Sequence, residues 1–261
     1  MSEPLINSQT PATATILAVP LGLSKGRVPR DRSQIPTGSM PFSKSFSMPI
    51  IPRAEWPDRI ADMERTKSRL SDICTQAGIP PLNQNGTNYC WAHGPVTAME
   101  IMRAVNGLPY VNLSAASVAA PIKRGANQGG WGGEALEYMV EHGTVSAEFW
   151  PLNSRNTSLD SKPEVQANRA LHKVTEWLDL DNRDFDQLMT CLLLRIPVAI
   201  GLNWWSHEVC AVDPVYEGGK FQVRIRNSWG SWGDNGYGLL SESKATPDDA
   251  CAPIVSFASL T

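Results

Sequence analysis

The chain has 261 residues, of which 42% are hydrophobic and 19% are charged, and its formal net charge is −3. This composition indicates a globular protein with a sizeable core. The small net charge gives no reason to expect a nucleic acid or an anionic membrane as a partner. The longest apolar stretch, 188–202, is interrupted by Arg195 and Pro197 and is shorter than the roughly 20 residues of a membrane span, so no transmembrane helix is expected.

The five cysteines are scattered along the chain and show neither Cys-x-x-Cys spacing nor a cluster with histidine. We therefore expect no metal site and no cofactor, and a reducing compartment in which at most one cysteine has a chemical role. The apolar patch at 16–23 follows Glu3 and no Lys or Arg, unlike a secretion signal. The expected location is intracellular, either in the cytoplasm or within a virion or other protein assembly.

Residues 1–50 differ in composition from the rest, with seven prolines, eight serines and no helical or strand period. They hold five Lys or Arg against two Asp or Glu, so this segment is mildly basic on an acidic body. The composition predicts an extended arm rather than a folded domain. Two interpretations stay open: a disordered tail, or an arm held by the body or by another subunit.

Residues 51–160 carry helical signals. Three helices are predicted, over 57–77, 90–105 and 134–142. Pro57 suits the first turn of the first helix, and Gly78 follows its end. The second helix is apolar nearly all round, which predicts a buried central helix. Gly143 is expected to end the third.

Residues 161–261 carry strand signals after one more helix. The predicted elements are a helix over 184–194, a strand over 197–201, and a hairpin of strands 208–212 and 221–226 around 217–219. A helical part followed by a β-rich part predicts an α+β fold of two lobes. The predicted division is an arm of residues 1–50, a helical lobe of 51–160 and a β-rich lobe of 161–261.

Cys90 is the first residue of the predicted central helix. A thiol is a weak nucleophile near neutral pH unless its pKa is lowered, and the unpaired N–H groups and dipole of a helix N-terminus do this. The position therefore suits a thiolate. The alternative is that Cys90 simply packs in the core, because cysteine is among the most buried residue types.

Three segments resemble signature segments of the papain family of cysteine peptidases. Residues 84–92, Gln-Asn-Gly-Thr-Asn-Tyr-Cys-Trp-Ala, resemble the nucleophile loop and keep its separation of Gln and Cys. Residues 206–209, Ser-His-Glu-Val, resemble the histidine segment, and 226–237 resemble the long and specific Asn-Ser-Trp-Gly signature. The resemblance covers about 79–240. It implies a papain-like fold, with a helical left lobe, a β-barrel-like right lobe and the active-site cleft between them.

Carried over to the matching positions, the resemblance implies a role for each residue. Cys90 would attack the scissile carbonyl as a thiolate, with His207 as its acid/base partner. Asn227 would orient His207, and Trp229 would shield their hydrogen bond from water. Gln84, with the backbone N–H of Cys90, would form the oxyanion hole.

The resemblance also describes the cleft. Gly129 and Gly130 would offer their backbone to an extended protein or peptide substrate. The loop 201–206 is much shorter than its counterpart in papain, so the family's substrate preference does not transfer. Trp204 and Trp205 lie in this loop, and they either line the cleft or belong to the core.

Other positions depart from the family pattern. Extracellular members carry a disulfide at the nucleophile loop, and its two positions hold Thr87 and Asn127 here, while Pro121 replaces a further cysteine. These losses favour folding in a reducing compartment. Residues 1–78 are shorter than the family's inhibitory pro-segment, and the helix over 57–77 lacks its sequence pattern, so proteolytic activation is not indicated.

Three functions are compatible with these observations. The first is a cysteine-type peptidase that hydrolyses peptide bonds through a Cys90 thioester. The second is a structural or assembly component, for example of a phage virion, that keeps the fold and docks on a protein partner through residues 1–50. The third is a thiol acyltransferase that uses the same mechanics.

Overall fold

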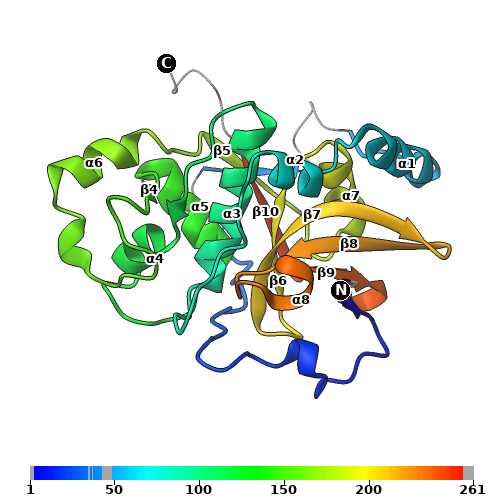
Figure 1. Cartoon of the computed structure of the whole chain (residues 1–261), viewed down its shortest axis with the longest axis horizontal. Coiled ribbons are helices and arrows are strands. Elements are labelled where there is room, and N and C mark those ends of the chain that lie inside the picture. The colour runs from blue at the N-terminus through cyan, green and yellow to red at the C-terminus, as the bar shows by residue number, and fades with distance from the viewer. Residues whose placement is uncertain (1–2, 35, 37, 43–48, 255–261) are drawn as a thin grey trace.

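A computed structural model describes residues 3–34, 36, 38–42 and 49–254. The chain forms an α+β fold with a helical lobe and a lobe built on one large sheet, and helix α3 (Cys90–Val105) lies between them (Figure 1). In the described part of the chain no helix is long and apolar enough to cross a membrane.

The helical lobe packs around the buried helix α3. Its other elements are α4 (Ala116–Ile122), α5 (Gly132–Glu141), α6 (Pro163–Ala170), η4 (Thr157–Leu159) and a two-stranded sheet of β3 (Leu113–Ser114) and β4 (Val145–Ser146). As its all-round apolar sequence predicts, α3 is buried along nearly its whole length. Trp91, Val96 and Met99 pack on one side with the helical lobe, whereas Ala98 and Ile101 pack on another with α2.

The large sheet has eight strands in the order β1-β9-β8-β7-β6-β10-β5-β2. Its members are β1 (Leu5–Ile6), β2 (Ser39–Pro41), β5 (Glu176–Asp179), β6 (Val198–Leu202), β7 (His207–Glu217), β8 (Lys220–Arg226), β9 (Tyr237–Ser241) and β10 (Asp249–Ile254). The six inner strands pair antiparallel. The predicted hairpin is confirmed, and its turn contains Gly218 and Gly219, both at positive φ, as tight hairpin turns require.

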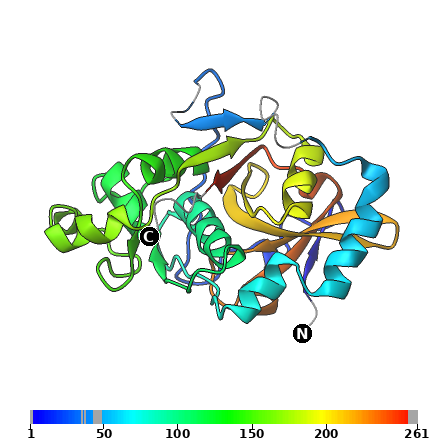
Figure 2. The ribbon, with the colours of Figure 1, turned by 90° about the horizontal axis from the view of Figure 1, so that it is seen from above.

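Both edge strands of this sheet come from the N-terminal arm. Strand β1 pairs in parallel with β9, and β2 pairs in parallel with β5 (Figure 2). Ile6, Leu17 and Phe42 of the arm are buried in the core of the sheet lobe. The described part of the arm therefore contains two short strands and is held by the body of the protein. The residues of the arm between 43 and 48 lie outside the described part.

The predicted helix over 57–77 is two helices, α1 (Trp56–Thr66) and α2 (Leu70–Gln76), preceded by η3 (Arg53–Glu55). Lys67 adopts the left-handed conformation, with φ of 54°, and ends α1. The break lets the two helices face different cores: Trp56 packs with the sheet lobe, while Leu70 packs against α3. The single helix was wrong because helical periodicity does not reveal a change of packing partner.

The remaining elements close the sheet lobe. They are η1 (Thr15–Leu17), α7 (Phe185–Leu193), α8 (Trp232–Asn235) and η5 (Glu242–Lys244). Helix α7 lies within a residue of its predicted bounds, and the Asp184 carboxylate accepts a hydrogen bond from the backbone N–H of Gln187 at its start. Trp56 of α1 shares the core of this lobe, so the predicted boundary at residue 51 does not coincide with a boundary between cores.

Candidate active site

Cys90 is the first residue of α3 and is fully buried. Burial, with a smaller contribution from the Glu208 carboxylate, raises the pKa of its thiol to about 12, although backbone N–H groups of Glu208, Gly26 and Trp91 beside the sulfur oppose this. The helix N-terminus is thus present as predicted, but the thiol is protonated in this state. Its contact with the backbone of Glu208 places the sulfur beside the start of β7.

His207 is the first residue of β7, next to Glu208. Its Nε2 lies 2.8 Å from the Asn227 Oδ1, which also accepts the backbone N–H of Ser228 at 2.8 Å. Because this oxygen is an acceptor, Nε2 is the imidazole nitrogen that carries the proton. Nδ1 is buried and has no hydrogen-bond partner in the described part of the chain. The imidazole therefore keeps one nitrogen free to take a proton.

The surroundings of His207 keep it neutral. Burial lowers its pKa to about 3, the hydrogen bond to Asn227 raises it, and the nearby Lys25 lowers it further. The Trp229 ring stacks on the imidazole at a centroid distance of 4.4 Å, as predicted for a shield, and the Trp205 ring meets it edge-on at 5.1 Å. Burial therefore disfavours the charged form of both groups, the Cys90 thiolate and the His207 imidazolium.

The Gln84 side chain is held by three hydrogen bonds, one of them to a carbonyl oxygen of the arm. Its Nε2 donates to the backbone oxygen of Ser24 at 2.9 Å and to that of Thr87 at 2.7 Å, and its Oε1 accepts the Ser228 hydroxyl at 2.6 Å. The Trp229 indole N–H donates to the same Ser24 oxygen at 3.1 Å. Two donors of the site thus converge on one carbonyl oxygen of the arm.

Gly130 pairs with the arm as a strand partner. The backbone N–H of Val28 donates to the Gly130 oxygen at 2.7 Å, and the Gly130 N–H donates to the Gly26 oxygen at 2.9 Å, with Arg27 in parallel register opposite Gly130. Gly129 lies so close that a Cβ on it would be 2.3 Å from the Gly26 oxygen. Both glycines thus contact the arm, and their predicted contact with an extended substrate stays a prediction.

Gly26 is the point of closest approach between the arm and the nucleophile loop. A Cβ on Gly26 would lie 1.9 Å from the backbone oxygen of Asn88. This backbone atom cannot move aside as the end of a flexible side chain could. Only glycine fits this position. Its N–H also lies beside the sulfur of Cys90.

Residues 24–28, which we call the cleft segment, therefore cover the site. Figure 1 shows the arm, in blue, running along the lower edge of the molecule from β9 toward the helical lobe. Two ion pairs also hold the arm on the sheet. Arg30 of the arm binds Asp179 of β5 at 2.5 Å, and Glu3 binds Arg224 of β8 at 2.6 Å. Residues 1–78 lack the sequence pattern of an inhibitory pro-segment, yet residues 24–28 cover the site. The sequence carried no signal for this covering segment, because its contacts with Gln84, Trp229 and Gly130 join residues far apart in the chain.

Hydrogen bonds occupy the place of the missing disulfide. The Asn127 Oδ1 accepts the backbone N–H of Asn88 at 2.6 Å, and its Nδ2 donates to the Gly86 oxygen at 3.0 Å. The Asn88 side-chain amide donates a hydrogen bond to the backbone oxygen of Asn127 at 3.0 Å. The nucleophile loop is thus tied to the segment before Gly129 without a disulfide, and all five cysteines are unpaired.

Trp205 belongs to the aromatic core of the site. It is buried, packs against Trp229 and Trp232, and donates from its indole to the Leu17 oxygen of the arm at 3.1 Å. Trp204 stacks on it at 5.5 Å. Of the two alternatives, cleft or core, Trp205 belongs to the core. It packs against the His207 ring and also donates a hydrogen bond to the arm.

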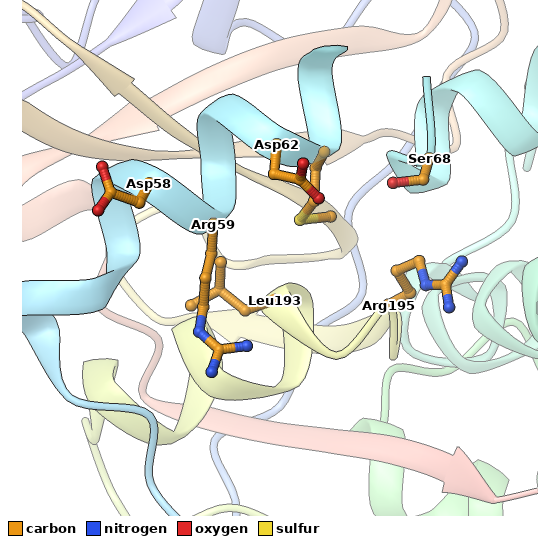
Figure 3. Close-up of a pocket in the computed structure, with 7 residues that line it drawn as sticks. Asp58, Arg59, Asp62, Ser68, Leu193 and Arg195 are labelled. Carbon is orange, nitrogen blue, oxygen red and sulfur yellow. The ribbon is translucent and has the colours of Figure 1, made fainter. Parts of the chain in front are cut away.

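A separate cavity of about 480 Å³ lies elsewhere, between α1 and the end of α7 (Figure 3). Charged side chains, among them Asp58, Arg59, Asp62 and Arg195, line it, and it shares no residue with the site. The described residues contain no group of three His, Cys, Asp or Glu that could hold a metal ion.

The model of the papain family of cysteine proteases matches residues 74–221, more than half of the chain. The chain belongs to this family, as its motifs predicted, and it is a cysteine peptidase with an α+β papain-like fold.

Among its relatives, zingipain-2 of Zingiber officinale is 28% identical over 205 residues, which are 70% of this chain and 90% of the relative. Cathepsin L 2 of Paramecium tetraurelia is 27% identical over 175 residues, 59% of this chain and 53% of the relative.

Solved structures share the fold at low identity. Procathepsin L 3 from the larval midgut of Tenebrio molitor has a TM-score of 0.60 at 18% identity, covering 67% of this chain and 66% of that one. The recombinant stem bromelain precursor has a TM-score of 0.60 at 20% identity, with coverage of 72% and 70%. The family match, zingipain-2 and cathepsin L 2 do not favour the alternative of a purely structural assembly component.

Proposed function

We propose that this protein is a latent cysteine endopeptidase in which Cys90 is the nucleophile and His207 the acid/base. The observation that carries the assignment is the hydrogen bond from His207 Nε2 to Asn227 Oδ1, which leaves Nδ1 free while the sulfur lies beside residue 208. His207 takes the thiol proton, and the sulfur attacks the substrate carbonyl carbon. The imidazolium then protonates the leaving amine, which gives the thioester.

The second half of the reaction uses the same groups. Neutral His207 removes a proton from water, the hydroxide attacks the thioester carbonyl, and the Cys90 thiolate leaves and regains a proton. Gln84 Nε2 stabilises the oxyanion in both steps, a contribution of about 3 kcal/mol for one such donor. Its bond to the Ser24 carbonyl supports this role, because it binds a carbonyl oxygen of an extended chain next to the nucleophile.

Substrate binding follows the path of the cleft segment. Gly129 and Gly130 have no side chains, and Gly130 uses both of its backbone groups to hold an extended chain. A peptide substrate would take the same bonds once the arm has left. The described state is therefore inactive, because the cleft segment occupies the substrate site and the buried thiol and imidazole are both neutral.

The experiment is labelling of Cys90 by an epoxide or vinyl-sulfone thiol inhibitor, followed by intact mass and peptide mapping. The Gly26→Ala chain, in which the arm cannot dock as described, is compared with the unaltered chain. Labelling of Cys90 is expected to be fast in the variant and slow in the parent, and to be lost in the Gly26→Ala/His207→Ala double variant. A correctly folded Gly26→Ala chain without an adduct on Cys90 contradicts the assignment.

The acyltransferase alternative is tested in the same variant by adding a primary amine to the peptide assay. Hydrolysis predicts free acid as the product, whereas transfer predicts the amide. Docking of residues 1–50 on another protein stays a prediction, and it competes with the contacts of the cleft segment. Size-exclusion chromatography of both chains tests docking on a second copy of this chain: larger species only after displacement of the arm would support such docking.

We also propose that the protein folds in an intracellular, reducing compartment. The five buried, unpaired cysteines and the hydrogen bonds at Asn127 support this. Protein isolated from its source without reductant should take up five alkyl groups after unfolding. An uptake of three or fewer would show disulfides and contradict the proposal.

A further inference from the structure

The side chain of Arg27 fills an acidic pocket in the body of the protein. Its guanidinium binds the Asp249 carboxylate directly, and a second terminal nitrogen lies 3.9 Å from the Glu208 Oε2. The side chains of all three are at most 2% exposed. A fully buried cation thus lies between two fully buried carboxyl groups.

Both acids belong to the body and not to the arm. Glu208 lies on β7, where its Oε2 also accepts the backbone N–H of Gly132 at 3.1 Å, and Asp249 lies on β10. The pocket therefore stays acidic when the arm leaves. Burial raises the pKa of both carboxyls and Arg27 lowers it, so the pocket resists ionisation unless a cation enters.

The shape of the pocket suits a long side chain. A Cβ on Gly201 would lie 2.4 Å from the Arg27 Cζ and 2.5 Å from the Asp249 Oδ1. Because residue 201 has no side chain, there is space for the Arg27 guanidinium to contact the Asp249 carboxylate. A planar group with several donors can bond both acids at once, which a single ammonium group does less well.

The position of the pocket relates it to substrates. Arg27 is the residue opposite Gly130, at the backbone position that the proposed function assigns to an extended peptide. We propose that this pocket is a specificity subsite for the arginine side chain of peptide substrates, and that Arg27 occupies it as a mimic in the latent state. The inference rests on the proposed peptidase function. The competing explanation is that the pocket serves only to anchor the arm.

The first test needs no turnover. The full-length Arg27→Ala chain should gain about 2 °C or more in Tm with millimolar n-propylguanidinium, and no such gain with the uncharged n-propylurea. The unaltered chain, whose pocket is filled, should not respond, and Asp249→Asn added to Arg27→Ala should remove the gain. If Arg27→Ala does not fold, the Gly26→Ala chain replaces it, since its arm is displaced while the pocket is unchanged. Equal responses to guanidinium and urea overturn the subsite.

The second test measures selectivity in the Gly26→Ala chain. Peptides identical except for arginine, citrulline or leucine at one position are compared by kcat/KM. Arginine is expected to exceed citrulline, its neutral near-isostere, by at least about tenfold, and Asp249→Asn should reduce that ratio. Turnover without this preference overturns the inference and leaves the peptidase function intact. A guanidinium response without any turnover supports the pocket and counts against the peptidase function.

Discussion

The catalytic side chains and the cleft segment face each other, but different forces hold them. His207 and Asn227 are fixed by a side-chain hydrogen bond and by an aromatic face on the sheet lobe. The cleft segment is fixed by backbone hydrogen bonds, by the close approach of Gly26 and by one buried ion pair. Changes to the first group should remove turnover with little loss of stability. Changes to the second should raise turnover and weaken the docking of the arm.

The largest effect is expected at the nucleophile. In the Gly26→Ala chain, Cys90→Ala should lower kcat/KM by roughly 10⁴-fold or more, because no thioester forms, while Tm changes little. Cys191→Ala is the matched control. Cys191 is an equally buried thiol in α7, so its loss should lower Tm through lost packing and leave kcat/KM unchanged. Equal turnover in both variants would refute Cys90 as the nucleophile.

The next effect concerns the orientation of the imidazole. Asn227→Ala in the same background should lower kcat by about 10²-fold, because His207 loses the acceptor that fixes its ring and its protonated nitrogen. Steady-state kinetics measures it. The exposed Asn156, which caps η4, provides the control, and Asn156→Ala should leave kcat unchanged. A change in KM alone would argue against an orienting role for Asn227.

Substitutions in the arm are expected to raise activity, whereas those at the catalytic side chains lower it. Gly26→Ala should raise kcat/KM of the full chain by at least about tenfold, because its Cβ collides with the Asn88 backbone and displaces the cleft segment. Gly22→Asn is the control in the same arm. A Cβ at Gly22 meets nothing within 4 Å, and asparagine tolerates its φ of 80°. Activity that rises equally in both variants would mean that the cleft segment does not restrain the enzyme.

The smallest effect is on the pH dependence of stability, away from the cleft. Burial lowers the pKa of His172 to about 4, from an ordinary value of 6.5. The folded chain therefore binds fewer protons than the unfolded chain between about pH 4 and 6.5, and this histidine makes stability fall as pH falls through that window. His172→Gln should reduce the drop in Tm between pH 6.5 and 4.5, and His142→Gln, at an exposed position, should not.

Local patterns were enough to predict the helix that carries Cys90, the hairpin of β7 and β8, and, with the family motifs, that His207 and Asn227 lie together. These features depend on neighbours close in sequence: Cys90 begins a helix that is apolar nearly all round, and Asn227 lies beside Ser228, which helps to fix it. The division of α1 from α2 escaped prediction because Trp56 and Leu70 face different cores.

What the sequence by itself determined is the family and its α+β fold, while the pairing of Cys90 with His207 stays a prediction. Only the tertiary structure decided that the thiol is buried, which raises its pKa, and that the chain's own arm covers it. The physical reason is that these contacts join residues far apart in the sequence. Gly26 approaches the backbone of Asn88 closely, and Arg27 forms a buried ion pair with Asp249. A composition rich in proline and serine contains no trace of either contact.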